Sequence, residues 1–172
     1  GETAVHSGHW MMGVLSILLL VYGIRDPSRS RGSVLAGALL AAMPVVAWEM
    51  STAYVDCALT FYLLAGFIVL LAFRRTGNQR WIYTGGLFTG LALASKYNGL
   101  AWLPAAVVCL AIWSRLRGHC WRRICKNTFI FLSIAGIILL PWLARNYQAT
   151  GNPFFPLPLP GFDSPHITAE LI

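Results

Sequence analysis

The sequence is poor in charged residues, and acidic residues are the scarcest of them. Charged residues make up 11% of the chain and only 6 residues are acidic, whereas hydrophobic residues make up 57%. The mean hydropathy is +0.63. A soluble domain carries roughly 25% charged residues. The composition therefore excludes an ordinary soluble domain and indicates an integral membrane protein.

Motifs of soluble enzymes are also missing. The chain has no glycine-rich phosphate loop, no nucleophile elbow and no His-Glu zinc helix. His119, Cys120 and Cys125 match no strong zinc spacing, so we expect no metal ligands among them and no disulfides. Whether a divalent cation takes part in the function is left open by these observations.

Long apolar runs dominate what is present. Six of them are separated by polar turns: 10–24, 34–48, 57–73, 81–94, 100–113 and 129–143. The second and third approach the roughly 20 residues that cross a bilayer once flanking residues are included, whereas the fourth and fifth are short or marginal. The turn at Lys96 divides the fourth run from the fifth, because a merged helix would be too long and would hold a central lysine. We predict an all-α, polytopic bundle of about six spans, with residues 1–172 as one domain and 144–172 as an exoplasmic proline-rich tail.

Basic residues gather on one side of these spans. All but two of the 13 Lys and Arg lie in the turns 25–31, 74–80 and 115–126. The positive-inside rule makes that side cytoplasmic, and contact with anionic lipid accounts for these arginines. The opposite side receives every acidic residue except Asp26. We therefore expect a protein of the bacterial inner (plasma) membrane with a periplasmic functional face, and the net charge of +7 does not indicate nucleic acid.

The two cations on the exoplasmic side lie where helices are expected to end. Lys96 is followed by Tyr97, and Arg145 by Asn146. Lysine offers a compact charge and arginine a planar fork, and both suit a phosphate at the membrane surface. Snorkelling of the cations beside an aromatic belt is the alternative. We take Lys96, Tyr97, Arg145 and Asn146 as candidate substrate-binding residues.

Two carboxylates lie around the turn between the second and third apolar runs. An acidic group at the edge of a hydrocarbon layer is costly unless it reaches water, a partner or a substrate. Asp56 opens a helix, where the macrodipole alone favours an acid, but it could also orient a hydroxyl or act as a base. Glu49 could instead simply reach the headgroups. Asp56 and Glu49 are the candidate catalytic residues, and Tyr54 is a further candidate for binding the substrate.

Three stretches, in order, resemble one group of membrane enzymes. They are STAYVD at 51–56, GLALASKY at 90–97 and PWLARNYQATGNPFFP at 141–156. These stretches resemble the membrane glycosyltransferases of the C-type fold, family 39, which include protein O-mannosyltransferases and aminoarabinose transferases of lipid A. The resemblance implies transfer of a sugar from a polyprenyl-phosphate carrier to an acceptor lipid, glycan or protein on the periplasmic or lumenal face. No cofactor beyond that donor is implied.

The same resemblance implies roles for individual residues. Asp56 would support the active site, Lys96 and Arg145 would face the phosphate of the carrier, and the reaction would be an inverting displacement. The principal carboxylate of such enzymes lies in an earlier exoplasmic loop. Because the chain begins at Gly1, shows no signal peptide and lacks that segment, we expect a fragment of a longer protein that is inactive alone.

Two other classes of protein compete with this interpretation. A transporter or lipid flippase would also use short helices meeting at a charge, as the runs around Lys96 do. However, the charges lie at the ends of the runs, and no internal repeat is visible. A structural membrane subunit would tolerate replacement of Asp56, Lys96 and Arg145, whereas an enzyme would lose transfer and a transporter would lose flux.

Overall fold

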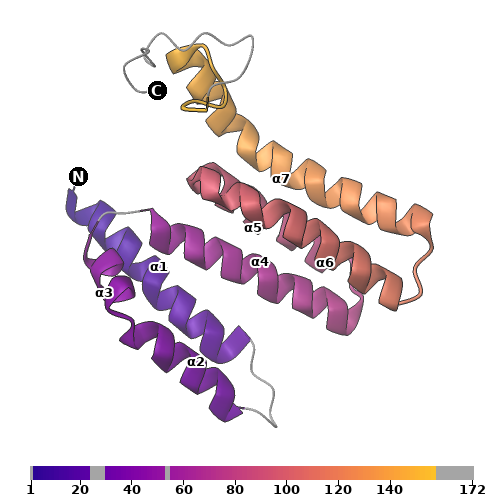
Figure 1. Cartoon of the computed structure of the whole chain (residues 1–172), viewed down its shortest axis with the longest axis horizontal. Helices are drawn as coiled ribbons and strands as arrows, with labels where there is room; N and C mark the ends of the chain where they lie inside the picture. Colours follow the sequence, from indigo (N-terminus) through magenta and orange to yellow (C-terminus); the bar gives the residue numbers. More distant parts are fainter. Residues whose placement is uncertain (1, 24–29, 53–54, 158–172) are drawn as a thin grey trace.

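The computed structural model describes residues 2–23, 30–52 and 55–157, and these ranges contain helices and no strand (Figure 1). The elements in chain order are α1 (Glu2–Gly23), α2 (Ser30–Ala42), α3 (Pro44–Ser51), α4 (Asp56–Thr76), α5 (Arg80–Ser95), the 3-10 helix η2 (Tyr97–Ala101), α6 (Trp102–Leu116) and α7 (Trp121–Thr150). The predicted all-α class is confirmed.

The predicted number of about six spans is not confirmed. Among the described residues, three helices are long and apolar enough to cross a membrane: Asp56–Thr76, Tyr97–Leu116 and Trp121–Thr150. The pair α2 and α3, bent by 63°, brings the number to four if it counts as one broken span. The helix α5 has 16 residues, which corresponds to about 24 Å and falls short of a hydrocarbon core of roughly 30 Å.

Two prolines in apolar runs affect their helices in opposite ways. Pro44 begins α3 after an extended Met43, so the run 34–48 forms two helices rather than the one expected. Proline has no amide hydrogen and suits the first turn of a helix. Pro141 lies inside α7, and this helix continues to Thr150. Residues 144–150, which were expected to belong to the tail, are therefore helical.

The apolar core lies among α4, α5, α6 and α7. Its fully buried members are Leu70, Phe73, Ile82, Ala106, Leu110 and Phe131. Glycines allow α5 to approach α7 at backbone distance: a Cβ on Gly90 would lie 2.7 Å from the Ala135 carbonyl oxygen and 2.7 Å from the Ile138 Cβ. A Cβ on Gly86 would lie 2.8 Å from the Phe131 carbonyl oxygen. Small residues at a helix–helix contact allow such close packing.

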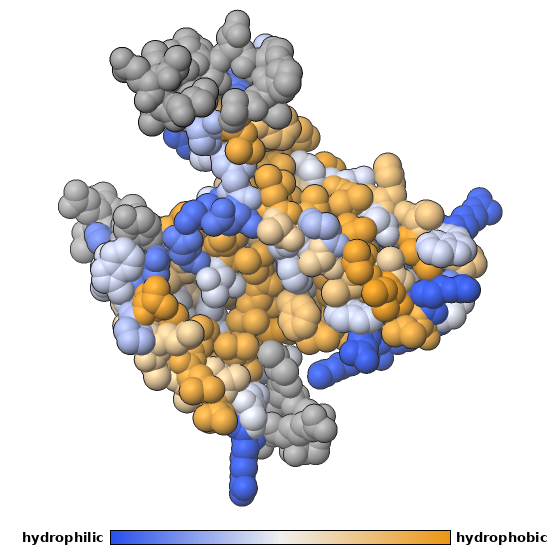
Figure 2. All heavy atoms as spheres, viewed as in Figure 1, coloured by the Kyte–Doolittle hydropathy of each residue, from blue (hydrophilic) through white to orange (hydrophobic). Residues whose placement is uncertain are grey.

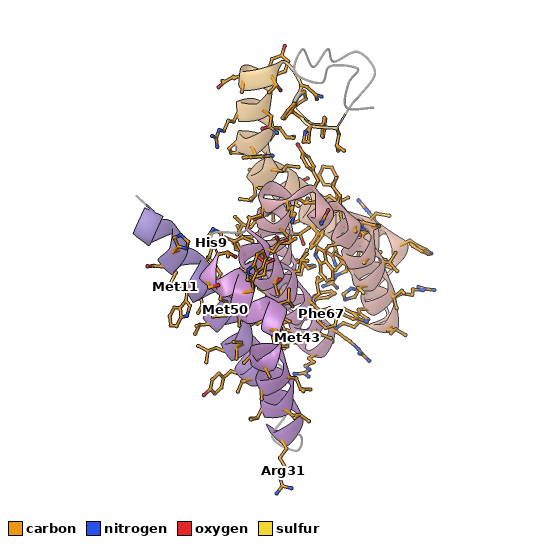
Figure 3. All side chains as sticks on the ribbon, turned by 60° about the vertical axis from the view of Figure 1, so that its left-hand side comes forward. His9, Met11, Arg31, Met43, Met50 and Phe67 are labelled. Atoms are coloured by element: carbon orange, nitrogen blue, oxygen red, sulfur yellow. The ribbon has the colours of Figure 1, made fainter. Side chains whose placement is uncertain are left out.

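Because successive helices alternate in direction, their connections gather at two ends of the bundle (Figure 1). One, the Lys96 end, holds the start of α4, the break between α5 and η2, and the end of α7. The other, the arginine end, holds the connections from α4 to α5 and from α6 to α7. In Figure 3, Arg31 projects from the tip of α2, away from the end of the α1–α3 group where His9 and Met50 lie. Figure 2 shows apolar side chains over most of the visible face, with the most hydrophilic ones projecting at its edges.

Two arginines of the arginine end also stabilise the fold. The Arg117 guanidinium donates a hydrogen bond of 2.8 Å to the Arg74 carbonyl oxygen, at the C-terminus of α4. Cations stabilise such helix ends. Arg74 in turn lies over the Trp113 ring, with its Cζ 5.8 Å from the ring centroid. These residues therefore join α4 to α6, a role beyond the predicted one in orientation and lipid contact.

Candidate functional site

Asp56 and Lys96 form an ion pair at the Lys96 end. The Lys96 Nζ lies 2.7 Å from Asp56 Oδ1 and 3.0 Å from Oδ2. Asp56 is in the first turn of α4, where its charge also complements the helix dipole. The Lys96 side chain remains 39% exposed and the Asp56 side chain 31% exposed, so a ligand can reach both. The pair joins two candidates that lie 40 residues apart in the sequence.

A local break in the chain places the lysine opposite Asp56. Lys96 follows the last residue of α5 and has an extended backbone, with φ −160° and ψ 143°. Its carbonyl accepts a hydrogen bond of 2.9 Å from the Gly99 amide as η2 begins. A Cβ at Gly99 would lie 2.7 Å from the Ala92 carbonyl oxygen, so glycine permits η2 to fold back against α5. The predicted tight turn at Lys96 is thus present.

A cavity of about 280 Å³ adjoins Asp56 of the ion pair and is lined by both candidate acidic residues. Asp56 borders it from α4, and Glu49 borders it from α3. The Glu49 Oε2 atom is buried and has no hydrogen-bond partner among the described residues. The remaining lining residues are Gly13, Ser16, Leu40, Val45, Val46, Cys57 and Thr60. Two carboxylates in an otherwise largely apolar wall favour a ligand with hydrogen-bond donors.

Tyr97 and Asn146 are brought together, but their polar groups are used within the protein. The Asn146 Nδ2 donates to the Tyr97 hydroxyl at 3.3 Å and to the Pro153 carbonyl oxygen at 3.2 Å. The Tyr97 hydroxyl donates to the Phe155 carbonyl oxygen. Both residues were predicted to bind substrate, and the structure shows them holding the segment that follows α7.

The remaining candidates are not joined to this group. Arg145 is exposed on α7, and its guanidinium Cζ lies 5.8 Å from the centroid of the Trp142 ring. No hydrogen bond or ion pair within the described part of the chain links Arg145 to Asp56 or Lys96. Tyr54 lies outside the described residues. Within the same described ranges, no group of three or more His, Cys, Asp or Glu is placed to hold a metal ion, and the four cysteines are free thiols.

One residue of this region was missed by the sequence reasoning. Asn152 is fully buried, although it lies in what was predicted to be an exoplasmic proline-rich tail. Its Nδ2 donates to the Leu157 carbonyl oxygen at 2.9 Å, and its Oδ1 accepts from the Phe154 amide at 2.9 Å. An asparagine next to Pro153 was the available signal, because asparagine supplies side-chain hydrogen bonds in turns.

Comparison with known families decides the class of protein. The model of the dolichyl-phosphate-mannose-protein mannosyltransferase family matches residues 1–144. The chain belongs to this family. The predicted resemblance is thereby confirmed, and the protein is a membrane glycosyltransferase of the mannosyltransferase type. The matched part contains Glu49, Asp56 and Lys96 and ends just before Arg145. No curated protein and no solved structure matches the chain.

Proposed function

We propose that the protein transfers a sugar from a polyprenyl-phosphate carrier to an acceptor on the exoplasmic face. The observation that carries this proposal is the Asp56–Lys96 pair at the edge of a cavity that also holds Glu49. Membership of the mannosyltransferase family supports the reaction type. The clustering of arginines at the opposite end of the bundle supports an exoplasmic site, because basic loops remain cytoplasmic.

Lys96 is proposed to receive the phosphate of the carrier. Its ammonium group is held by one carboxylate and is still accessible, so a phosphate oxygen can replace a carboxylate oxygen as its partner. When the sugar leaves, negative charge grows on the phosphate, and a fixed cation stabilises that charge. Arg145, exposed on α7, is proposed as a second cation for the same carrier.

The two carboxylates are proposed to serve the acceptor. The acceptor hydroxyl attacks the anomeric carbon from the side opposite the phosphate, and the bond from that carbon to the phosphate oxygen breaks. The hydroxyl proton passes to a carboxylate, and the bonding electron pair leaves with the phosphate. Glu49, whose Oε2 atom has no partner in the described residues, is better placed to take the proton than Asp56, which is paired with Lys96. Asp56 then orients the sugar or the acceptor.

The test is transfer of radiolabelled sugar from a panel of polyprenyl-phosphate sugars, in membranes that contain the whole protein. We expect Glu49→Gln, Asp56→Asn and Lys96→Gln each to lower the rate by about 10²-fold or more while the protein still inserts, since each removes an acid–base or electrostatic contribution. Arg75→Gln is the matched control, because it removes an exposed charge at the arginine end.

Three outcomes would count against the proposal. Equal losses in Arg75→Gln and Lys96→Gln would mean that general charge, and not this site, supports transfer. Transfer from donor presented only to the cytoplasmic face of sealed vesicles would contradict the proposed orientation. Flux of a labelled lipid without transfer of any sugar would favour the transporter class instead.

A further inference from the structure

The segment that follows α7, residues 152–157, is held by side chains and not by regular secondary structure; we call it the 152–157 strap. Gly151, with φ 73°, ends α7, and the strap then turns back beside the helix end (Figure 1). Pro153 and Pro156 have no amide hydrogen to donate to a helix or a sheet ladder. Instead, the carbonyls of Pro153, Phe155 and Leu157 each accept a hydrogen bond from a side chain.

Asn152 closes this strap upon itself. Its amide nitrogen and its amide oxygen bind Leu157 and Phe154 respectively, and the whole residue is buried. Its backbone amide also donates to the Thr150 hydroxyl at 3.2 Å. Removing this side chain would leave the Leu157 carbonyl and the Phe154 amide without their partner, and unpaired backbone groups favour opening to water.

The strap in turn restrains the residue next to Lys96. The Tyr97 hydroxyl contacts both Phe155 of the strap and Asn146 of α7. Tyr97 directly follows Lys96, whose amide donates a long hydrogen bond of 3.4 Å to the Ala92 carbonyl oxygen and whose carbonyl accepts one of 2.9 Å from the Gly99 amide. The Tyr97 hydroxyl adds contacts from outside this local turn, and these contacts tie the C-terminal side of Lys96 to the strap and to α7.

We propose that Asn152, Asn146 and Tyr97 are positioning residues that hold Lys96 opposite Asp56. Asn152 folds the strap, the strap and Asn146 fix Tyr97, and Tyr97 sets the direction in which the Lys96 side chain leaves the backbone. The strap lies beyond the part of the chain that matches the mannosyltransferase family. The positioning of Lys96 does not depend on the proposed function. Only the expected effect of these residues on sugar transfer rests on the proposed function.

The lysine content of the chain allows a test that does not depend on transfer. The chain contains two lysines, Lys96 and Lys126, and Lys126 lies at the arginine end, in α7. Membranes are opened so that both faces are exposed and are treated at one pH with a water-soluble N-hydroxysuccinimide ester. Acylation of each lysine is followed by mass spectrometry, with Lys126 as the internal reference. An amine held by a carboxylate reacts slowly, because its ammonium form is stabilised.

We expect Asn152→Ala and Tyr97→Phe to raise the acylation rate of Lys96 several-fold relative to Lys126, as Asp56→Asn does by removing the partner directly. Asn98→Ala is the matched control: this exposed asparagine is next to Tyr97 in η2, and we expect it to leave the Lys96 rate unchanged. Chymotrypsin reports the strap separately, because cleavage after Phe154 should become faster in Asn152→Ala than in the wild type.

Other outcomes would show which step of the proposal fails. Faster cleavage with unchanged Lys96 acylation would show that the strap does not position the lysine. Unchanged cleavage would show that Asn152 does not hold the strap. If the acylation results are as expected but no donor supports transfer, the positioning stands and the proposed function fails. If transfer occurs, Asn152→Ala should lower its rate. When Asn152→Ala is combined with Lys96→Gln, the rate should fall no further than in Lys96→Gln alone, because both changes act through the same lysine.

Discussion

The helices α4–α7 and the helices α1–α3 bury different kinds of residue. In α4–α7, large apolar side chains such as Leu70, Phe73 and Phe131 are fully buried. Among the described residues of α1–α3, the buried ones are small: Gly13, Ser16, Ser33 and Gly37. The first group is therefore packed to backbone distance, whereas the second leaves room for the cavity beside Glu49 and Asp56. The candidate site lies on the boundary between a group of helices with a large apolar core and a group without one.

The largest effect expected from this difference concerns glycine. Gly90→Ala places a Cβ 2.7 Å from a backbone oxygen of α7, which cannot move without separating α5 from α7. Gly13→Ala instead meets the Met50 side chain, at 2.4 Å from its Cγ, and a flexible methionine can turn away. We expect Gly90→Ala to lower the free energy of unfolding by about 1–3 kcal/mol, and Gly13→Ala by less than about 1 kcal/mol. Reversible unfolding in mixed micelles measures both.

Gly136→Ala is the control for this comparison, because no atom lies within 4 Å of the Cβ it would add. It lies within α7, where alanine favours the helix over glycine by about 1 kcal/mol, so a slight stabilisation is expected. Equal losses at Gly90 and Gly13 would contradict the difference between the two groups of helices.

A second effect concerns the packing within α4–α7. The Trp102 Nε1 donates a hydrogen bond of 3.1 Å to the hydroxyl of Thr89, which is fully buried on α5. Trp102→Phe leaves this hydroxyl without its donor, and we expect a loss of about 1–3 kcal/mol. The double variant Thr89→Val/Trp102→Phe removes both partners. Its loss in free energy of unfolding should be smaller than the sum of the losses in the two single variants. Strict additivity of the two losses would show that the hydrogen bond does not couple α5 to α6.

The smallest effect is a pH dependence at His119, which lies between α6 and α7. Burial, and then the charges of Arg123 and Arg117, lower the pKa of His119 from its ordinary value of 6.5. The unfolded chain keeps the ordinary pKa, so it binds the proton more readily as the pH falls below 6.5. The contribution to stability is therefore present above pH 6.5 and is lost as the pH falls towards the lower pKa of the folded protein. Melting temperatures at pH 7.5 and 5.5 should differ slightly more for the wild type than for His119→Gln; an equal difference would exclude this origin.

The sequence predicted those features that depend on local pattern. The helical class, the break at Lys96 and the two polar ends follow from the lengths of apolar runs and from the placement of arginines. Proline was harder, because Pro44 divides a run whereas Pro141 is accommodated inside α7. Whether a helix continues through a proline depends on what packs around it, and this cannot be read from the run itself.

The candidate site was predicted residue by residue but not as an arrangement. Asp56 and Lys96 were both proposed, yet their pairing joins positions 40 residues apart, and a single sequence carries no signal for such a contact. Tyr97 and Asn146 were proposed for their chemical type, but type alone does not reveal that backbone carbonyls of the chain already use their donors. Prediction from sequence therefore ends where long-range packing decides which polar groups are free for a ligand.

The short helix α5 has a consequence for the bilayer itself. Its 16 residues run from Arg80 to the break at Lys96, and they are shorter by roughly 6 Å than the hydrocarbon thickness. Such hydrophobic mismatch thins the surrounding lipid or leaves the end of the helix below the headgroup plane. In the first case Lys96 lies in the headgroup layer, and in the second its long side chain reaches towards that layer. Under the proposed function, a carrier anchored by its own hydrocarbon tail would present its phosphate to this lysine while the tail stays in the membrane.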